Sequence, residues 1–307
     1  MPHTTTSPLS PGDPGTIATR AYAMLVFATL CWGANAIFGK LAVGEIPPML
    51  LVSTRWAGAL LLMVVFARSH VRRDWPVIRG RLLFISSLAV MGFTGFNVLF
   101  YTAAYSTPAL NIGIIQGSIP VFVLIGSFLA YRTRIKSLQF IGVLLTISGV
   151  LFVGSRGDLS QLAGLAFNLG DWLMIAACAL YGAYTVGLRR RPATSALGLF
   201  TIMAGIAFIV SLPFSLAEYS VGDFYWPSPS GWAIVALVTI FPSFLAQIFF
   251  IHGVEMIGPN RAGVFINLVP IFSSVFAVFI LGESIEVYHI TALGLVLGGI
   301  WISEHGK

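Results

Sequence analysis

Long apolar runs separated by short polar segments fill almost the whole chain. A helix needs about 20 predominantly apolar residues to cross the hydrocarbon core of a bilayer, and ten runs approach that length. The pattern therefore predicts an all-α polytopic membrane protein with ten transmembrane helices and no room for a soluble domain. The predicted spans lie near Ala21–Leu41, Met49–Ala67, Leu82–Tyr105, Ala109–Tyr131, Leu138–Val153, Leu169–Gly187, Ala196–Leu216, Ala233–Gly253, Ala262–Leu281 and Val287–Ile302.

Two polar segments carry further information. Residues 1–19 are rich in Pro, Ser and Thr and lack an apolar core, which predicts a disordered cytoplasmic tail and not a signal peptide. The stretch Glu218–Ser230 contains four aromatic residues, ending in Trp226, and Trp301 lies near the end of the last span. Tryptophan and tyrosine gather at membrane interfaces, so we assign both tryptophans to an interface.

Composition excludes several classes of protein. The chain is 57% apolar and 9% charged, whereas soluble domains are roughly 25% charged. Its formal charge of +6 is not a nucleic-acid signal, because no basic patch with interleaved aromatic residues is present. Cys31 and Cys178 both fall inside predicted spans, which favours small core residues over a disulfide or a metal site.

The basic residues predict the direction of the spans. Of the 17 Lys and Arg residues, 14 lie on one alternating set of loops and termini. Only Lys40 and Arg156 lie on the other set, and Arg55 falls inside the second span. Basic residues accumulate on the cytoplasmic side of membrane proteins. We therefore expect a multi-pass membrane protein with both termini in the cytoplasm.

The chain also repeats itself weakly. A shift of 150 places Ile119-Pro120 over Val269-Pro270, and a shift of 149 places Trp32-Gly33 over Tyr181-Gly182. Each copy contains five predicted spans, so the second copy must enter the membrane from the opposite side. The sequence thus predicts two inverted five-helix repeats, at residues 20–155 and 169–305, which is a common plan of secondary transporters.

Three segments carry a resemblance to a known family. They are WGANAIFGK (Trp32–Lys40), PPMLLVSTRWAGALLL (Pro47–Leu62) and GPNRAGVFINLVPIFSSVFAVFILGESI (Gly258–Ile285). With Pro270 and the Gly282-Glu283 pair, they resemble the drug/metabolite transporter superfamily, EamA type, over about residues 20–305. The chain looks most like its bacterial aromatic amino-acid exporter, and this resemblance implies a place in the bacterial inner membrane. The fourth span departs from the pattern, because it ends in AYRTRI where a Gly-Glu pair is often seen.

Polar side chains inside the spans are the candidate substrate-binding residues, because polar groups at membrane depth are costly. Pairs three or four residues apart share one helix face. The resemblance implies that the first, third, fourth, sixth, eighth and ninth helices line a central cavity. Each amide could also serve only to tie helices together, at about 0.6–2 kcal/mol. The candidates are Trp32, Asn35, Asn97, Tyr101, Gln116, Tyr181, Tyr184, Gln247 and Asn267.

Arg55 and two prolines leave alternatives open. An unpaired charge at the position of Arg55 costs about 2.5–3.5 kcal/mol or more. Arg55 could bind a substrate carboxylate, or it could bond backbone carbonyls or extend outward to Glu45; because its helix is outside the expected cavity set, a structural role is favoured. Pro120 and Pro270 occupy equivalent places in the repeats. Each is expected to kink its helix, either as a hinge or to bow the helix around a cavity.

Several signals are missing, and they narrow the function. No carboxylate lies in the middle of a span, which disfavours ion coupling. No Walker, HExxH or other catalytic motif is present, so we predict neither an enzyme nor a cofactor. We expect a secondary transporter that exports aromatic and other apolar amino acids by alternating access. Its partners are a small-molecule substrate and the lipid bilayer. The alternatives are a multidrug or cationic-compound exporter of the same fold, and a membrane enzyme or scaffold.

Overall fold

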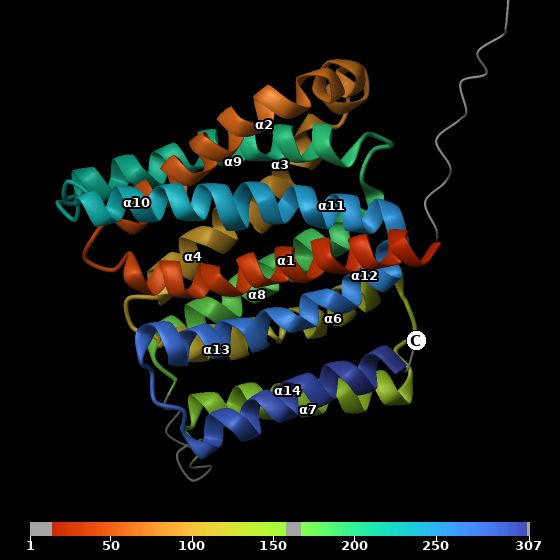
Figure 1. Cartoon of the computed structure of the whole chain (residues 1–307), viewed down its shortest axis with the longest axis vertical. Helices are drawn as coiled ribbons and strands as arrows, with labels where there is room; N and C mark the ends of the chain where they lie inside the picture. The colour runs from red at the N-terminus through yellow and green to blue at the C-terminus, as the bar shows by residue number, and fades with distance from the viewer. Residues whose placement is uncertain (1–13, 158–166, 306–307) are drawn as a thin grey trace, which may run out of the picture.

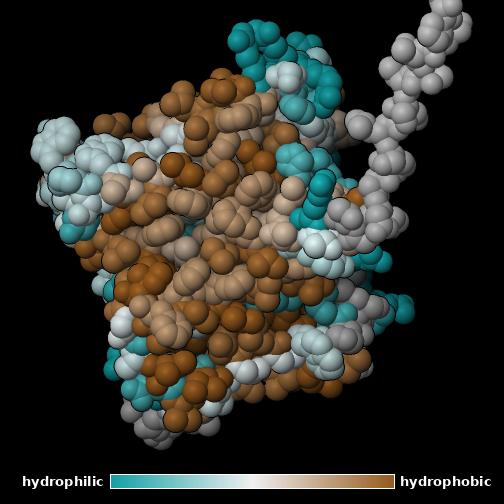
Figure 2. All heavy atoms as spheres, in the orientation of Figure 1, coloured by the Kyte–Doolittle hydropathy of each residue, from teal (hydrophilic) through white to brown (hydrophobic). Residues whose placement is uncertain are grey.

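A computed structural model describes residues 14–157 and 167–305, and all of the regular structure in them is helical. Ten helical spans are long and apolar enough to cross a membrane. Their surface is largely hydrophobic on the face shown in Figure 2, with hydrophilic residues gathered toward the helix ends. The predicted tail lies partly outside the described residues. Its last part, from Pro14, already belongs to the first helix.

Five spans are single helices and one is followed by a short 3-10 turn, whereas four consist of several segments. The continuous spans are α1 (Pro14–Leu41), α2 (Pro48–Arg79), α7 (Ser137–Gly154), α8 (Leu169–Gly187), α9 (Ala196–Ser220) and α14 (Val287–His305). The third span consists of α3 (Leu82–Ala89), η1 (Val90–Gly95) and α4 (Phe96–Ala103). The eighth span consists of α10 (Pro229–Val238), η4 (Thr239–Leu245) and α11 (Ala246–Ile257). The fourth span consists of α5 (Ala109–Gln116) and α6 (Ile119–Tyr131). The ninth span consists of α12 (Pro259–Phe265), η5 (Ile266–Leu268) and α13 (Val269–Leu281).

The two halves of the chain are built as inverted repeats. Each half supplies five spans, so equivalent helices cross the membrane in opposite directions. In Figure 1 the equivalent helices α2 and α9 lie together at one edge of the bundle, and α7 and α14 lie together at the opposite edge. Between these edges, α1 packs against α11 and α13, and its equivalent α8 packs against α4 and α6. Both α1 and α8 therefore pack mainly on helices of the other repeat.

Small residues allow α7 and α14 to approach closely. A Cβ added at Gly149 would lie 2.8 Å from the Ala292 carbonyl oxygen, and one added at Gly299 would lie 2.5 Å from the Gly142 carbonyl oxygen. Such small-residue faces let transmembrane helices pack backbone to backbone. Residue 142 is equivalent to residue 292, and residue 149 to residue 299, so the contact has the pseudo-two-fold symmetry of the repeat.

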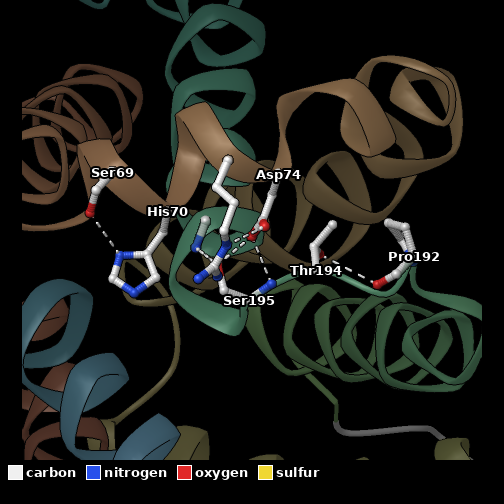
Figure 3. A network of polar contacts seen from close by, with 8 residues as sticks. Ser69, His70, Asp74, Pro192, Thr194 and Ser195 are labelled. Atoms are coloured by element: carbon white, nitrogen blue, oxygen red, sulfur yellow. Dashed lines mark hydrogen bonds and ion pairs between the residues drawn. The ribbon is translucent and has the colours of Figure 1, made fainter.

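Reciprocal caps tie α2 to α9. Near the end of α9, the Glu218 carboxylate accepts hydrogen bonds from the backbone N–H groups of Met49 and Leu50, both at 3.0 Å. Near the end of α2, Asp74 accepts the backbone N–H of Ser195 at 2.8 Å and also its hydroxyl (Figure 3). Each acid satisfies N–H groups at or just before the partner helix's N-terminus, where negative charge is favourable.

One boundary differs from the prediction. The second span was expected to end at Ala67, but α2 continues to Arg79 through the polar stretch that contains Asp74 and Pro76. The cap on α9 gives the physical reason, because Asp74 can reach Ser195 only if α2 continues beyond its apolar part. Most of this extension is exposed, and Asp74 is its buried exception together with Ile78.

Candidate functional site

A cavity lies at the centre of the bundle, between the two repeats. Spans from both halves line it, including α1, α2 and α8 and all four segmented spans. Its wall combines aromatic rings and side-chain amides with one guanidinium group. The polar and indole-bearing lining residues are Trp32, Asn35, Arg55, Trp56, Asn97, Gln116, Tyr181, Gln247 and Asn267.

The segmented spans are interrupted at this cavity. The π-helical turns η1 and η4 occupy equivalent positions in the two repeats, and Gly92, Phe93 and Pro242 from these turns line the cavity. π-Helical turns inside α-helices are frequent at functional sites. The fourth span breaks between Gln116 and Ile119, and the ninth contains the 3-10 turn η5. Irregular backbone at membrane depth is tolerated where it lines a cavity, as it does here.

Pro120 and Pro270 do not lie inside continuous helices, contrary to the prediction. Pro120 and Pro270 each lie in the first turn of a new helical segment, α6 and α13 respectively. A proline is favourable there because its missing N–H would have no partner in the helix anyway. The expectation of a kink within a continuous helix is therefore wrong: the prolines begin the second segment of a broken span. Both line the cavity.

Arg55 lies at the wall of the cavity and is only 4% exposed. Its Nε and Nη2 atoms donate to the Ser243 hydroxyl at 2.9 and 2.7 Å. Its Nη1 atom donates to Asn97 Oδ1 and to Tyr101 Oη, both at 2.6 Å. The Tyr101 hydroxyl in turn donates to Asn35 Oδ1 at 3.0 Å. One guanidinium thus joins α1, α2, α4 and η4.

These contacts correct two expectations about Arg55. Its helix was placed outside the cavity, yet α2 contributes both Arg55 and Trp56 to the lining. Its guanidinium neither bonds backbone carbonyls nor extends to Glu45, because its hydrogen-bond partners are side chains on other helices. The Glu45 carboxylate instead accepts a hydrogen bond from the Ser228 hydroxyl.

Aromatic rings cover much of the remaining wall. Trp56 stacks on Phe93 with ring centroids 4.6 Å apart, and Phe96 packs on Tyr181 at 5.2 Å. Trp32 is held by a 3.1 Å hydrogen bond from its Nε1 atom to the Pro242 carbonyl oxygen. That carbonyl belongs to η4, so the π-helical turn positions an aromatic residue of the other repeat.

The structure gathers most of the predicted residues but not all. Tyr101 and Tyr184 do not line the cavity. Tyr101 lies behind Arg55 as its hydrogen-bond partner, and Tyr184 packs so closely on Gly92 that any Cβ there would overlap its ring. The residues that line it as predicted are Trp32, Asn35, Asn97, Gln116, Tyr181, Gln247 and Asn267. Sequence reasoning missed the aromatic residues of η1 and α4 and also Ser243, although Pro242 inside an apolar run was a visible signal of irregular backbone.

The two ends of the cavity differ. We call the end of the bundle where α1 begins and α14 ends the terminal end, and the opposite end the distal end. At the distal end, α5 packs against α1, α13 and α14, and a Cβ added at Gly113 would overlap the buried Ser273 side chain. Lys40 also joins α1 to the end of the third span there, through a 2.9 Å bond to the Ala104 carbonyl oxygen. The distal end is therefore closed.

The terminal end lacks the equivalent packing. Within the described residues, α12 makes no comparable contact with α6, α7 or α8, although its equivalent α5 packs closely on the matching helices. A Cβ added at Gly263, the equivalent of Gly113, would meet no atom within 4 Å. The repeats are thus alike in fold but not in packing, and the cavity is less enclosed toward the terminal end.

Comparison with known proteins assigns the family. A family model described as the EamA-like transporter family matches residues 19–155 and again residues 168–304. The chain belongs to the EamA-like transporter family. Each of the two matches covers one of the structural repeats, so the fold is two inverted five-helix repeats of this family.

The similar proteins are transporters by name. The uncharacterized transporter YetK of Bacillus subtilis is 30% identical over 92% of this chain and 86% of its own length. The uncharacterized inner membrane transporter YedA of Escherichia coli is 21% identical, over 91% of this chain and 88% of its own length. A solved crystal structure with 19% identity superposes with a TM-score of 0.63, covering 92% and 96% of the two chains, which shows the fold. This protein is a multi-pass membrane transporter.

Proposed function

We propose that this transporter moves small organic metabolites, aromatic and other apolar amino acids first, and that it does so by alternating access. The observation that carries the proposal is the central cavity, whose wall combines aromatic rings with a few polar groups. Such a wall suits a cargo with an apolar body and a small polar head. The resemblance to an aromatic amino-acid exporter supports export as the direction.

The unequal ends of the cavity support alternating access. In inverted-repeat transporters, one repeat or bundle rocks against the other around a fixed central site. Exchanging the packing of the two repeats would close the terminal end around Gly263 and open the distal end around Gly113. The present structure would then be one of two such states, open toward the terminal end. The breaks before Pro120 and Pro270 are the proposed hinges, because they lie between the moving segments and the cavity.

The basic residues support an orientation in which the terminal end faces the cytoplasm of a bacterial inner membrane. A periplasm-dependent reporter enzyme, such as alkaline phosphatase, fused after Lys307 should therefore show no activity. The same reporter fused within the segment that joins α9 to α10, at Asp223, should be active. High activity at Lys307 with none at Asp223 would reverse the proposed orientation.

Flux into liposomes that hold the purified protein tests the proposed function. Labelled phenylalanine should enter protein-containing vesicles faster than empty ones, and unlabelled phenylalanine inside should accelerate its entry by exchange. A proton or sodium gradient should change this flux little, because no carboxylate lines the described part of the cavity. Absence of flux for every amino acid would reject the proposed cargo. Uphill accumulation that an uncoupler abolishes would reject the passive mechanism.

The same cavity disfavours a cationic-compound exporter. Such a protein needs an acidic group to hold its cargo, whereas Arg55 is the one charged residue among the described residues that line the cavity. In the liposome assay, competition by hydrophobic cations and not by amino acids would favour that alternative.

A further inference from the structure

Arg55 is a buried charge without an opposite charge beside it. All of its hydrogen-bond partners, Ser243, Asn97, Tyr101 and Asn35, are neutral. The described acids at the distal helix ends serve other groups. Glu218 and Glu283 cap α2 and α5, Glu45 accepts from Ser228, and Asp171 accepts from Asn168 and Thr107. A charge at membrane depth is costly and normally has a partner, so its partner is to be sought outside the chain.

The guanidinium group is held rigidly and keeps spare capacity. It carries five N–H groups. Nε uses its one N–H on Ser243, and Nη1 uses its two on Asn97 and Tyr101. Nη2 uses one on Ser243, which leaves one Nη2 N–H with no partner within the described chain. Because Arg55 lines the cavity, an anionic ligand bound there would lie beside its positive charge and could accept this remaining N–H.

The surroundings of Arg55 indicate what the rest of that ligand is. The Trp56 ring lies 5.3 Å from the Arg55 guanidinium carbon and stacks on Phe93, which is also a lining residue. A carboxylate at Arg55 would therefore place its attached apolar body against an aromatic surface. In contrast, the described lining offers no carboxylate for an ammonium group, only amide and hydroxyl oxygens.

We propose that Arg55 binds the carboxylate of the cargo and that the cavity selects monocarboxylates with an apolar body, whether or not they carry an amino group. The proposal rests on the transport function proposed above and makes it more specific. It adds a class of cargo, simple organic acids, that an amino-acid transporter with an acidic subsite for ammonium would reject. Arg55 is then a specificity-determining residue as well as a link between helices.

Three ligands that share one body test this proposal on the full-length protein. They are phenylalanine, 3-phenylpropionate, which lacks the amino group, and phenylalaninamide, which lacks the carboxylate. We expect the first two to inhibit labelled phenylalanine flux with similar potency. The amide should be about 10- to 100-fold weaker, because it forfeits a hydrogen bond between two charged groups. This comparison needs no mutant, so it does not depend on whether a variant folds.

Variants locate the effect at Arg55. In Arg55→Gln, the preference for acid over amide should disappear, whereas Arg55→Lys should retain part of it because the charge remains. Arg134→Gln, which removes an exposed charge between α6 and α7, should leave the preference unchanged. Equal inhibition by acid and amide in the wild-type protein would overturn the proposal, as would an acid preference that survives in Arg55→Gln.

A second pair of ligands distinguishes failure of the proposed role of Arg55 from failure of the proposed aromatic amino-acid transport. In direct binding to the purified protein, 4-methylpentanoate and its amide present an aliphatic body in place of the aromatic one. If this acid binds and its amide does not, while no aromatic compound binds, the role of Arg55 stands and the aromatic preference fails. If none of the acids binds better than its amide, the role of Arg55 is refuted, whatever the amino-acid fluxes show.

Discussion

Replacement of Gly263 by leucine is expected to abolish transport while leaving the protein folded. In the present structure a Cβ added at this position meets no atom within 4 Å, so the variant is expected to be about as stable as the wild-type protein. In the opposite state proposed above, the symmetry of the repeats would bring Gly263 against Val123, as Gly113 now lies against Ser273. Overpacking costs about 1–3 kcal/mol, which would depopulate that state about 5- to 150-fold.

The matched control is Gly294→Leu in α14. This glycine also has no neighbour within 4 Å, but its repeat equivalent is Leu144, which is 48% exposed, so neither state should bury the new side chain. Liposome flux should fall only in Gly263→Leu, and a cysteine introduced at Val123 should remain open to a water-soluble thiol reagent in that variant. Wild-type flux in Gly263→Leu would show that the terminal end does not close around α12.

Alanine at Trp32 or Tyr181 is expected to weaken transport of aromatic amino acids several-fold. The two residues are repeat partners, and both line the cavity. Each aromatic contact with an aromatic cargo contributes about 0.5–1.5 kcal/mol beyond simple burial, so each loss should raise the half-saturating concentration about 2- to 12-fold. Phenylalanine or tryptophan at position 181 should be milder, because each retains a ring. Flux measured against phenylalanine and leucine separates loss of ring contact from general damage.

Interfacial tryptophans provide the comparison. Trp226 is 83% exposed and Trp301 is 63% exposed, and neither lines the cavity. Alanine at either position should leave the preference for phenylalanine over leucine unchanged. If these two substitutions alter the preference and those at Trp32 and Tyr181 do not, the aromatic residues of α1 and α8 only pack the bundle.

The spans and the repeat could be predicted because they rest on properties of short segments. Length and apolarity alone decide whether a segment can cross a bilayer, and all ten predicted spans are present. The largest boundary error is the end of α2, where a polar extension is held by Asp74 against Ser195, a residue 121 positions away in the sequence. The sequence of the α2 extension alone does not predict that Asp74 caps α9.

Arg55 shows where prediction of the site stopped. The cost of an intramembrane charge marked Arg55 as unusual. The sequence analysis nevertheless placed it outside the cavity, because the second span was not among the helices expected to line the cavity. The hydrogen bonds to Asn97 and Ser243 come from the third and eighth spans, and both of those spans contain a π-helical turn. Such a turn shifts which residues face a neighbour, so counting by 3.6 residues per turn fails across it.

The sequence by itself therefore determined that the chain crosses a membrane ten times as two inverted copies, and it indicated most of the polar side chains that line the cavity at membrane depth. These features follow from the cost of exposing polar groups to lipid, which each segment meets independently. Only the tertiary structure decided that Arg55 belongs to the cavity, that the prolines begin new helical segments, and that the distal end is more closely packed than the terminal end. Those features depend on packing between distant helices, where Gly113 and Gly263 occupy equivalent positions in the repeats and yet have opposite surroundings.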